Sequence, residues 1–133
     1  MQDSEPARRK IRFRQRVQPY SVNGLAQLSV KVPPMIHVVA IITAKPGMRA
    51  HLLEVFKEVI PTVRAEQGCI EYNVAVDIDG ADPAFGPETY LVIERWQSLP
   101  ALKAHAVAPH MVGFGERARD MIAARAVHVL EPA

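Results

Sequence analysis

The spacing of hydrophobic residues in the first patterned stretch predicts a strand followed by a helix. β-Branched residues fill 36–43, and apolar side chains occupy both parities there, which is typical of a strand covered on both faces. From 48 to 66 apolar residues recur at helical spacing and therefore share one face. That face consists of Leu52, Val55, Phe56, Val59 and Val63. Pro61 is expected to kink the helix, and Gly68 is placed to follow its end.

The next two predicted strands are joined by a long loop. Apolar and polar residues alternate over 69–78, and a second strand-like run covers 88–96. Residues 79–87, between them, are rich in Gly, Asp and Pro, which favour turns.

A second helical region and a last strand complete the pattern. Ser98 is suited to cap a helix that begins at residue 99 and carries a proline in its first turn. Pro109 interrupts this helix, and a second helical segment follows over about 110–123. Residues 125–130 are typical of a strand.

The order of the predicted elements is β-α-β-β-α-β, which indicates an α+β protein with a ferredoxin-like fold. The helices of such a fold cover only one face of the sheet, yet the first strand is apolar on both faces. No other patterned segment remains to cover the second face. We therefore predict a homodimer in which two chains pack sheet to sheet.

Composition narrows the class of protein. The chain has 133 residues, of which 49% are hydrophobic and 23% charged, so it can build the core of one globular domain. No apolar run approaches the roughly 20 residues that span a bilayer. Cys69 is the only cysteine, which excludes an internal disulfide and a cysteine-rich zinc site.

Charge divides the chain into a basic extension and an acidic domain. Residues 1–34 hold seven of the 16 basic residues and only two of the 14 acidic ones. They are expected to be a flexible arm or a mis-assigned start, with contact to phosphates or an anionic membrane as the alternative. They lack the apolar core of a secretory signal, so a cytoplasmic location is expected. Residues 35–133 are mildly acidic and carry no basic stripe, so no nucleic-acid partner is expected.

Three stretches of this domain carry a resemblance to a known family. They are 59–69 (VIPTVRAEQGC), 90–98 (YLVIERWQS) and 104–111 (AHAVAPHM). With them, residues 35–133 resemble the antibiotic biosynthesis monooxygenase family, most closely its bacterial quinol monooxygenases. The resemblance implies a dimeric α+β barrel. It also implies one of several chemistries, because the family includes cofactor-free oxygenases, haem-degrading enzymes and an isomerase of a phosphorylated sugar derivative.

Departures from each branch of the family narrow these chemistries. Ala40, His105 and Gly115 stand where haem-degrading members carry Asn, Trp and the iron-binding His, so haem degradation is disfavoured. Trp96 matches the polyketide-tailoring members, but Val92 replaces their Asn. The phosphorylated-sugar branch shares the His-x-x-x-x-Pro-His pattern of 105–110, although the sequence places no cationic phosphate contacts.

Two histidines are the candidate catalytic residues. His105 lies in an otherwise apolar or small helical stretch, and its chemistry suits a base near pH 7. His110 begins the next segment, where a helix N-terminus would keep it neutral. They are five residues apart with no carboxylate nearby in sequence, which disfavours a metal site. Neither a dinucleotide fingerprint nor a P-loop is present, so no cofactor is expected.

Four further residues are candidates for substrate binding: Trp96, Asn73, Tyr72 and Glu94. Tyr72 and Asn73 are adjacent in a strand, so only one of them can line a given pocket. Asn73 would suit a donor to a quinol oxygen, whereas Tyr72 and Trp96 could equally belong to the core. Glu94 could orient a histidine or act as a base, or form an ion pair across the dimer.

The function that these residues and the resemblance favour is oxidation of a small aromatic quinol or phenol by dioxygen. Deprotonation makes such a substrate its own reductant, and a base, oxyanion donors and a dry pocket would suffice. Two alternatives stay open. One is an isomerase or processing enzyme for a small phosphorylated or carbonyl metabolite, and the other is a non-catalytic protein that binds a small molecule.

Overall fold

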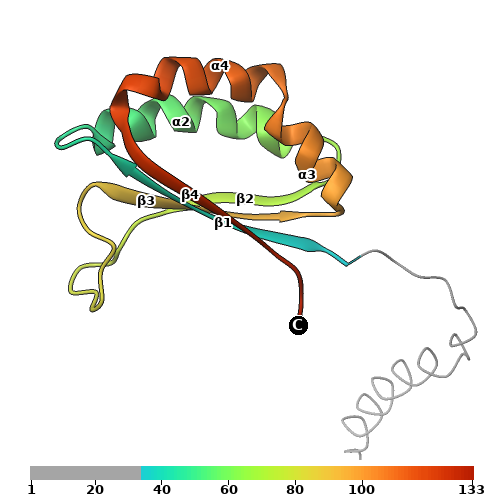
Figure 1. The fold of residues 1–133 in the computed structure, drawn as a ribbon, viewed down its shortest axis with the longest axis horizontal. Coiled ribbons are helices and arrows are strands. Elements are labelled where there is room, and N and C mark those ends of the chain that lie inside the picture. Colours follow the sequence, from blue (N-terminus) through green and yellow to red (C-terminus); the bar gives the residue numbers. More distant parts are fainter. Residues whose placement is uncertain (1–33) are drawn as a thin grey trace, which may run out of the picture. The chain divides into compact units, whose positions relative to one another are not determined.

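A four-stranded antiparallel sheet forms one layer of the protein and helices form a second layer on one of its faces (Figure 1). The structure, a computed structural model, describes residues 34–133. Its strands are β1 (Ile36–Ala44), β2 (Cys69–Ala75), β3 (Thr89–Trp96) and β4 (Ile122–Leu130). Its helices are α2 (Arg49–Arg64), α3 (Leu99–Ala106) and α4 (Pro109–Ala118), and a 3₁₀ turn follows over Arg119–Met121.

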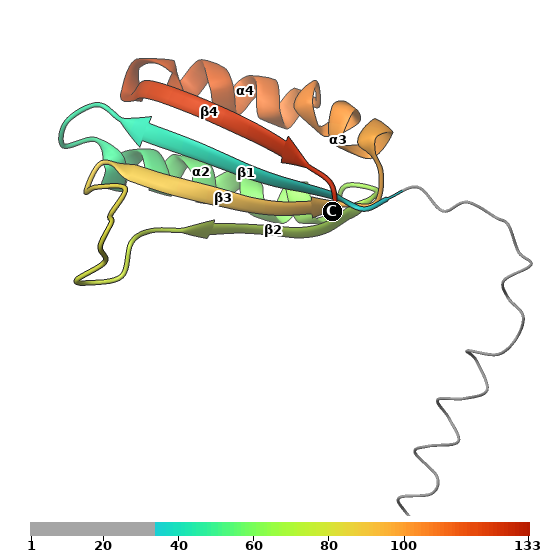
Figure 2. The same ribbon diagram turned by 60° about the horizontal axis from the view of Figure 1, so that its bottom comes forward.

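The strands lie in the order β2-β3-β1-β4, as Figure 2 shows. This order and the succession of elements confirm the predicted ferredoxin-like β-α-β-β-α-β fold. The expectation for the basic extension concerns residues 1–34, and all of these but Pro34 lie outside the described residues. Among the described helices, none combines the length and the apolar character needed to cross a bilayer.

Two predicted boundaries are wrong, for local reasons. The strand predicted over 69–78 ends at Ala75, because the Asp77 carboxylate instead accepts hydrogen bonds from the backbone of Phe85 and Gly86 and closes the loop. The last strand begins at Ile122 rather than at residue 125, since its first residues pair with the end of β1, where Ile122 lies opposite Ala44. The helical segment before it is correspondingly shorter.

Burial in β1 alternates between the two faces of the sheet. Ile36, Val38, Ala40, Ile42 and Ala44 are buried beneath the helices. The intervening residues, among them Val39 and Ile41, are only partly buried. The prediction was that both faces of this strand are covered. Within one chain the helices cover one face, and the other face stays open.

The core lies between the sheet and the apolar face predicted for α2. All five residues of that face are buried, and the helix continues through Pro61 to Arg64. Phe56 lies at the centre, with the ring centroids of Tyr72, Tyr90 and Phe114 at 5.9, 5.5 and 5.3 Å from its own.

The turn between α2 and β2 approaches α3 closely because of Gly68. The backbone there has φ +88°, a conformation that favours glycine. A Cβ at this position would lie 2.6 Å from the Cβ of Ala101, so any larger residue would clash with α3. The Gly68 carbonyl also accepts a hydrogen bond from the backbone of Gln97 at 2.8 Å. This packing holds the residues of the turn against the helix that carries His105.

Candidate active site

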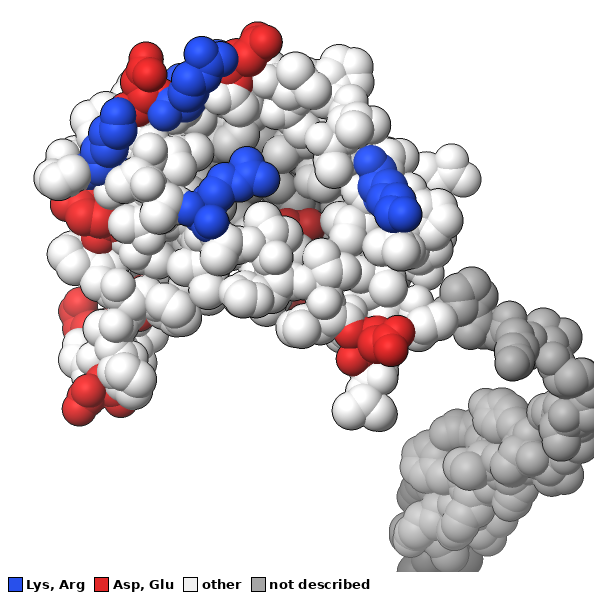
Figure 3. All heavy atoms as spheres, in the orientation of Figure 1, with Lys and Arg blue, Asp and Glu red and all other residues white. Residues whose placement is uncertain are grey.

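A cavity of about 440 Å³ lies between the sheet and the helices. Its volume is in the range of pockets that bind small molecules. Figure 3 shows the molecule hollowed on this side, with cationic side chains beside the hollow and acidic atoms within it. Most of the lining is apolar and comes from strands β1, β3 and β4 and from helices α2, α3 and α4. The polar and ionisable lining residues are Tyr72, Tyr90, Glu94, His105, Arg119 and Arg125.

One carboxylate oxygen joins the two candidate histidines. The Oε2 atom of Glu66 lies 2.9 Å from Nδ1 of His105 and 2.6 Å from Nε2 of His110. An ionised carboxylate can only accept hydrogen bonds, so with Glu66 in that form both ring nitrogens that face it would carry protons. When the His105 ring is neutral, this arrangement leaves the lone pair on its Nε2 atom.

The break between α3 and α4 makes this shared contact possible. Residues five apart in a continuous helix point in directions about 140° apart. Here α3 ends at Ala106 and Pro109 begins α4, so the direction of the chain changes between the two histidines. His105 in the last turn of α3 and His110 in the first turn of α4 can then face the same oxygen.

His105 is buried among aromatic rings beside the cavity. Only 6% of the residue is exposed. Its ring centroid is 4.7 Å from that of Trp96 and 5.4 Å from that of Tyr72, the latter in an edge-on arrangement. This packing fixes the plane of the imidazole, because the ring cannot turn without displacing its neighbours.

Glu94 lines the cavity with a carboxyl group of its own, whereas Glu66 does not reach the cavity wall. It is two residues from Trp96 on the same face of β3, and its Oε1 atom accepts a hydrogen bond of 2.8 Å from the indole Nε1. Burial raises the pKa of Glu94, and the hydrogen bond from Trp96 and the charge of His105 oppose that rise only in part. Because Glu94 faces the helices, it does not lie on the open face of the sheet, where an ion pair between sheet-packed chains would form.

Tyr72 and Asn73 are adjacent in β2 and lie on opposite faces of the sheet, as the alternation of a strand requires. Tyr72 is buried and lines the cavity, and burial raises the pKa of its phenol, which therefore stays protonated at neutral pH. Asn73 lies on the opposite face, exposed, where its side chain bonds to Arg64 and Glu71. The expectation that Asn73 lines this cavity is wrong.

Trp96 and His110 lie behind the cavity wall rather than in it. Trp96 is fully buried and contacts His105 and Glu94, while His110 reaches the site through Glu66. Of the six predicted site residues, the structure therefore brings five together and places three on the cavity surface: His105, Tyr72 and Glu94.

Four residues of this site were missed by sequence reasoning: Glu66, Tyr90, Arg119 and Arg125. Glu66 belongs to the 59–69 stretch that resembles the family, but a turn residue 39 positions from His105 gives no local signal. Tyr90 is four residues from Glu94 in the same strand, so both side chains lie on the same face. This alternation was the signal that could have identified Tyr90. Arg119 and Arg125 line the cavity as well, although nothing in the pattern around them distinguishes them from surface charges.

The same three residues that share the carboxylate oxygen could also hold a metal ion. One ligand atom each from Glu66, His105 and His110 lies within 4.8 Å of the others. No carboxylate is near the two histidines in sequence, but the fold brings Glu66 to them, and such a donor set suits zinc or iron. In the arrangement described, the ligand nitrogens carry the protons that they donate to Glu66, and a metal would have to displace both protons.

The raised pKa of Glu94 predicts how stability depends on pH. The folded protein holds this proton more tightly than the unfolded chain, whose glutamate titrates near 4.5. Below that pH both states are protonated and burial of the carboxyl carries no charge penalty. As pH rises through the folded pKa, the folded state is progressively destabilised. Glu94→Gln keeps the oxygen that accepts from Trp96 but does not ionise.

We therefore expect Glu94→Gln to gain stability relative to the native protein as the pH rises from 4.5 to 8. Urea unfolding across this range measures the difference. Glu116→Gln, a change at an exposed glutamate of α4, serves as control and should show no such trend. A difference for Glu94→Gln that stays flat with pH would contradict the account.

Comparison with known proteins supports the resemblance and covers most of the described domain. Residues 35–117 match the family described as antibiotic biosynthesis monooxygenase. The protein named "Probable quinol monooxygenase YgiN" of Escherichia coli strain K12 is 31% identical over 102 residues, which span 74% of this chain and 98% of that protein.

Solved structures agree with this assignment. The structure of Rv0793 from Mycobacterium tuberculosis superposes with a TM-score of 0.64 at 27% identity, over 74% of this chain and 95% of that one. PA3566 from Pseudomonas aeruginosa has a TM-score of 0.67 over 78% of this chain and 99% of that one, and at 22% identity it supports the fold alone. The predicted resemblance is confirmed, and the chain belongs to the antibiotic biosynthesis monooxygenase family.

Proposed function

We propose that this chain is a monooxygenase that oxidises a small aromatic quinol with dioxygen, without a metal or an organic cofactor. The observation that carries the proposal is the contact of 2.9 Å between Nδ1 of His105 and Oε2 of Glu66, from which we infer the tautomer of His105. Its Nδ1–H bonds to Glu66, and the ring lines an apolar cavity with Nε2 free to accept a proton. The family assignment and the similarity to a protein named as a quinol monooxygenase support the same reaction class.

The reaction begins with removal of a proton from a substrate hydroxyl by His105. The resulting aryloxide gives an electron to dioxygen far more readily than the neutral quinol does. Glu66 stabilises the imidazolium that forms, as a carboxylate does beside the histidine of a catalytic triad. His110 holds Glu66 from the other side and is thus a positioning residue.

Two groups in the cavity can stabilise the developing charge. The Tyr72 phenol stays protonated because burial raises its pKa, so it can donate a hydrogen bond to the substrate oxygen. Glu94, with its raised pKa, can donate a proton when protonated or accept one when ionised. The apolar walls exclude water, which strengthens each of these interactions.

The balance of atoms and electrons allows two outcomes. A naphthohydroquinone can lose two electrons and two protons to dioxygen, giving the quinone and hydrogen peroxide. Alternatively, one oxygen atom enters the ring, and the products are a hydroxyquinone and water. The second outcome is the monooxygenase reaction, and the absence of peroxide distinguishes it from the first.

We also propose that the active protein is a homodimer packed through the open face of the sheet. On this face Val39 lies opposite Ile93 and Ile41 lies opposite Leu91, which gives an apolar strip across β1 and β3. Ile93 is 39% exposed in the single chain. A second sheet placed on the strip would remove it from water, which is the usual fate of such a surface.

The dimer predicts that a charge on this strip separates the chains. In sedimentation measurements at micromolar concentration, the native protein is expected to have twice the mass of one chain and Ile93→Glu the mass of one. Val112→Glu is the matched control, since Val112 is 51% exposed but lies on α4. A native protein that sediments as a single chain would overturn the dimer.

Oxygen uptake with 1,4-naphthohydroquinone tests the reaction. With metal-stripped protein, we expect saturable uptake above the autoxidation rate. His105→Ala should lower kcat about a hundredfold or more, in the range of a lost general base. Glu66→Gln should lower kcat about tenfold with little change in KM. The amide no longer sets the tautomer and orientation of the His105 ring, but the cavity that binds the substrate stays intact. His51→Ala is the control, since that side chain is 64% exposed.

Other results would point elsewhere. Uptake that needs added iron or another metal would transfer the role of Glu66, His105 and His110 to metal binding. Conversion of a substrate under anaerobic conditions would favour the isomerase alternative. Tight binding with no turnover in any condition would indicate a binding protein.

A further inference from the structure

The cavity is polar at both ends and apolar in between. Glu94 and Tyr90 both face the helices from β3 and both line the cavity, but they are four residues apart, which is about 13 Å along a strand. Val92 lies between them on the same face. His105 lies with Glu94 at one end, because both contact Trp96.

The strand register places an arginine at the other end. Ile42 of β1 lies opposite Tyr90 of β3 on one side and opposite Arg125 of β4 on the other. These three residues therefore form one row across the sheet, on the face that lines the cavity. Arg119, in the 3₁₀ turn that leads into β4, lines the cavity as well.

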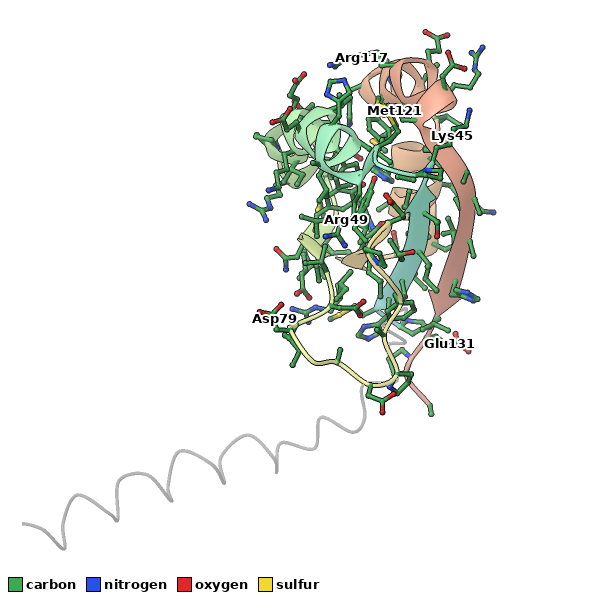
Figure 4. All side chains as sticks on the ribbon, turned by 90° about the vertical axis from the view of Figure 1, so that its left-hand side faces the viewer. Lys45, Arg49, Asp79, Arg117, Met121 and Glu131 are labelled. Carbon is green, nitrogen blue, oxygen red and sulfur yellow. The ribbon has the colours of Figure 1, made fainter. Side chains whose placement is uncertain are left out.

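Both arginines are free to bind a ligand. Arg119 and Arg125 are exposed and form no ion pair or hydrogen bond with another described residue through their side chains. Arg117, two residues from Arg119, is also exposed but differs in its contacts and its position. It bonds to Glu58 at 2.9 Å on the outer surface of the helices, away from the sheet (Figure 4), and does not line the cavity.

Tyr90 supplies an independent sign that a polar group belongs here. The residue is fully buried, and its hydroxyl has no hydrogen-bond partner among the described residues. A buried hydroxyl without a partner is costly, and such groups are usually satisfied by a ligand or water. Burial raises the pKa of this phenol, so it remains a hydrogen-bond donor at neutral pH.

We propose that the substrate is a hydroxyarene that carries an anionic group, such as a carboxylate, on the side remote from its reacting hydroxyl. Arg119, Arg125 and the Tyr90 hydroxyl bind the anionic group, the apolar middle of the cavity holds the aromatic body, and the hydroxyl meets His105 and Glu94. This inference deepens the proposed function and rests on it for the identity of the reacting end.

The charges at the two ends of the cavity also determine the orientation in which the substrate binds. An anionic group at the Glu94 end would meet the carboxyl group of Glu94 and lie near that of Glu66 behind His105, in a buried setting, which is unfavourable. At the arginine end the same group gains charge-assisted hydrogen bonds from two guanidinium groups. The cavity should therefore select substrates by the position of the anionic group as well as by its charge.

Steady-state oxygen uptake with three substrates tests the proposal. They are 1,4-naphthohydroquinone, the same compound with a carboxylate at C6 of the second ring, and its isomer with the carboxylate at C2 beside a hydroxyl. We expect kcat/KM to be at least tenfold higher for the C6 carboxylate than for the other two. Arg125→Gln and Arg119→Gln should each remove about tenfold of this advantage, measured as the ratio of kcat/KM for the C6 carboxylate to that for the neutral substrate. Arg117→Gln, a matched loss of charge, should leave this ratio unchanged.

A binding measurement keeps the inference separate from the proposed chemistry. Calorimetry compares naphthalene-2-carboxylate, which cannot be oxidised as a quinol, with naphthalene-2-carboxamide. The carboxylate should bind at least tenfold more tightly, and Arg125→Gln and Tyr90→Phe should weaken its binding but not that of the amide. Equal affinity for the two ligands would overturn the inference. Carboxylate binding without any oxygen uptake would uphold the anion site while the proposed oxygenase fails.

Discussion

The shared contact of Glu66 with His105 and His110 determines the chemistry that this cavity can perform. One oxygen lies 2.9 and 2.6 Å from the two rings, and as an ionised carboxylate it would accept from both and leave Nε2 of His105 without a proton. The contact exists because the backbone at Gly68 lets the α2–β2 turn approach α3, and because Pro109 separates the helices of the two histidines. The proposed base therefore depends on a glycine and a proline that do not line the cavity.

The rest of the cavity follows from how the sheet is arranged. The alternation along β3 places Tyr90, Glu94 and Trp96 on one face, and the antiparallel pairing with β1 and β4 brings Arg125 level with Tyr90. Acidic groups consequently collect at one end and cationic groups at the other. In this account the first end performs the proton transfer and the second selects and orients the substrate.

Periodicity was sufficient to predict the fold, because each element buries one face and the alternating and helical patterns report which face that is. It was not sufficient for the site. Glu66 and His105 are 39 residues apart, and their contact depends on the tertiary packing of a turn against a helix. The position of Asn73 shows the same limit, since its strand parity was known but the face that carries the cavity was not. Arg119 and Arg125 could not be told apart from surface charges, because the sequence does not show which face carries the cavity.

The most direct test of this account is the tautomer of His105, read from nitrogen-15 chemical shifts of the histidine rings at a pH where the ring is neutral. We predict that Nδ1 of His105 carries the proton and that Nε2 is bare, with His110 protonated at Nε2. Glu66→Gln should remove the preference for the Nδ1–H form of His105. A His105 ring protonated at Nε2 in the native protein would contradict the central claim, because no lone pair would then be available at the atom that is proposed to act as the base.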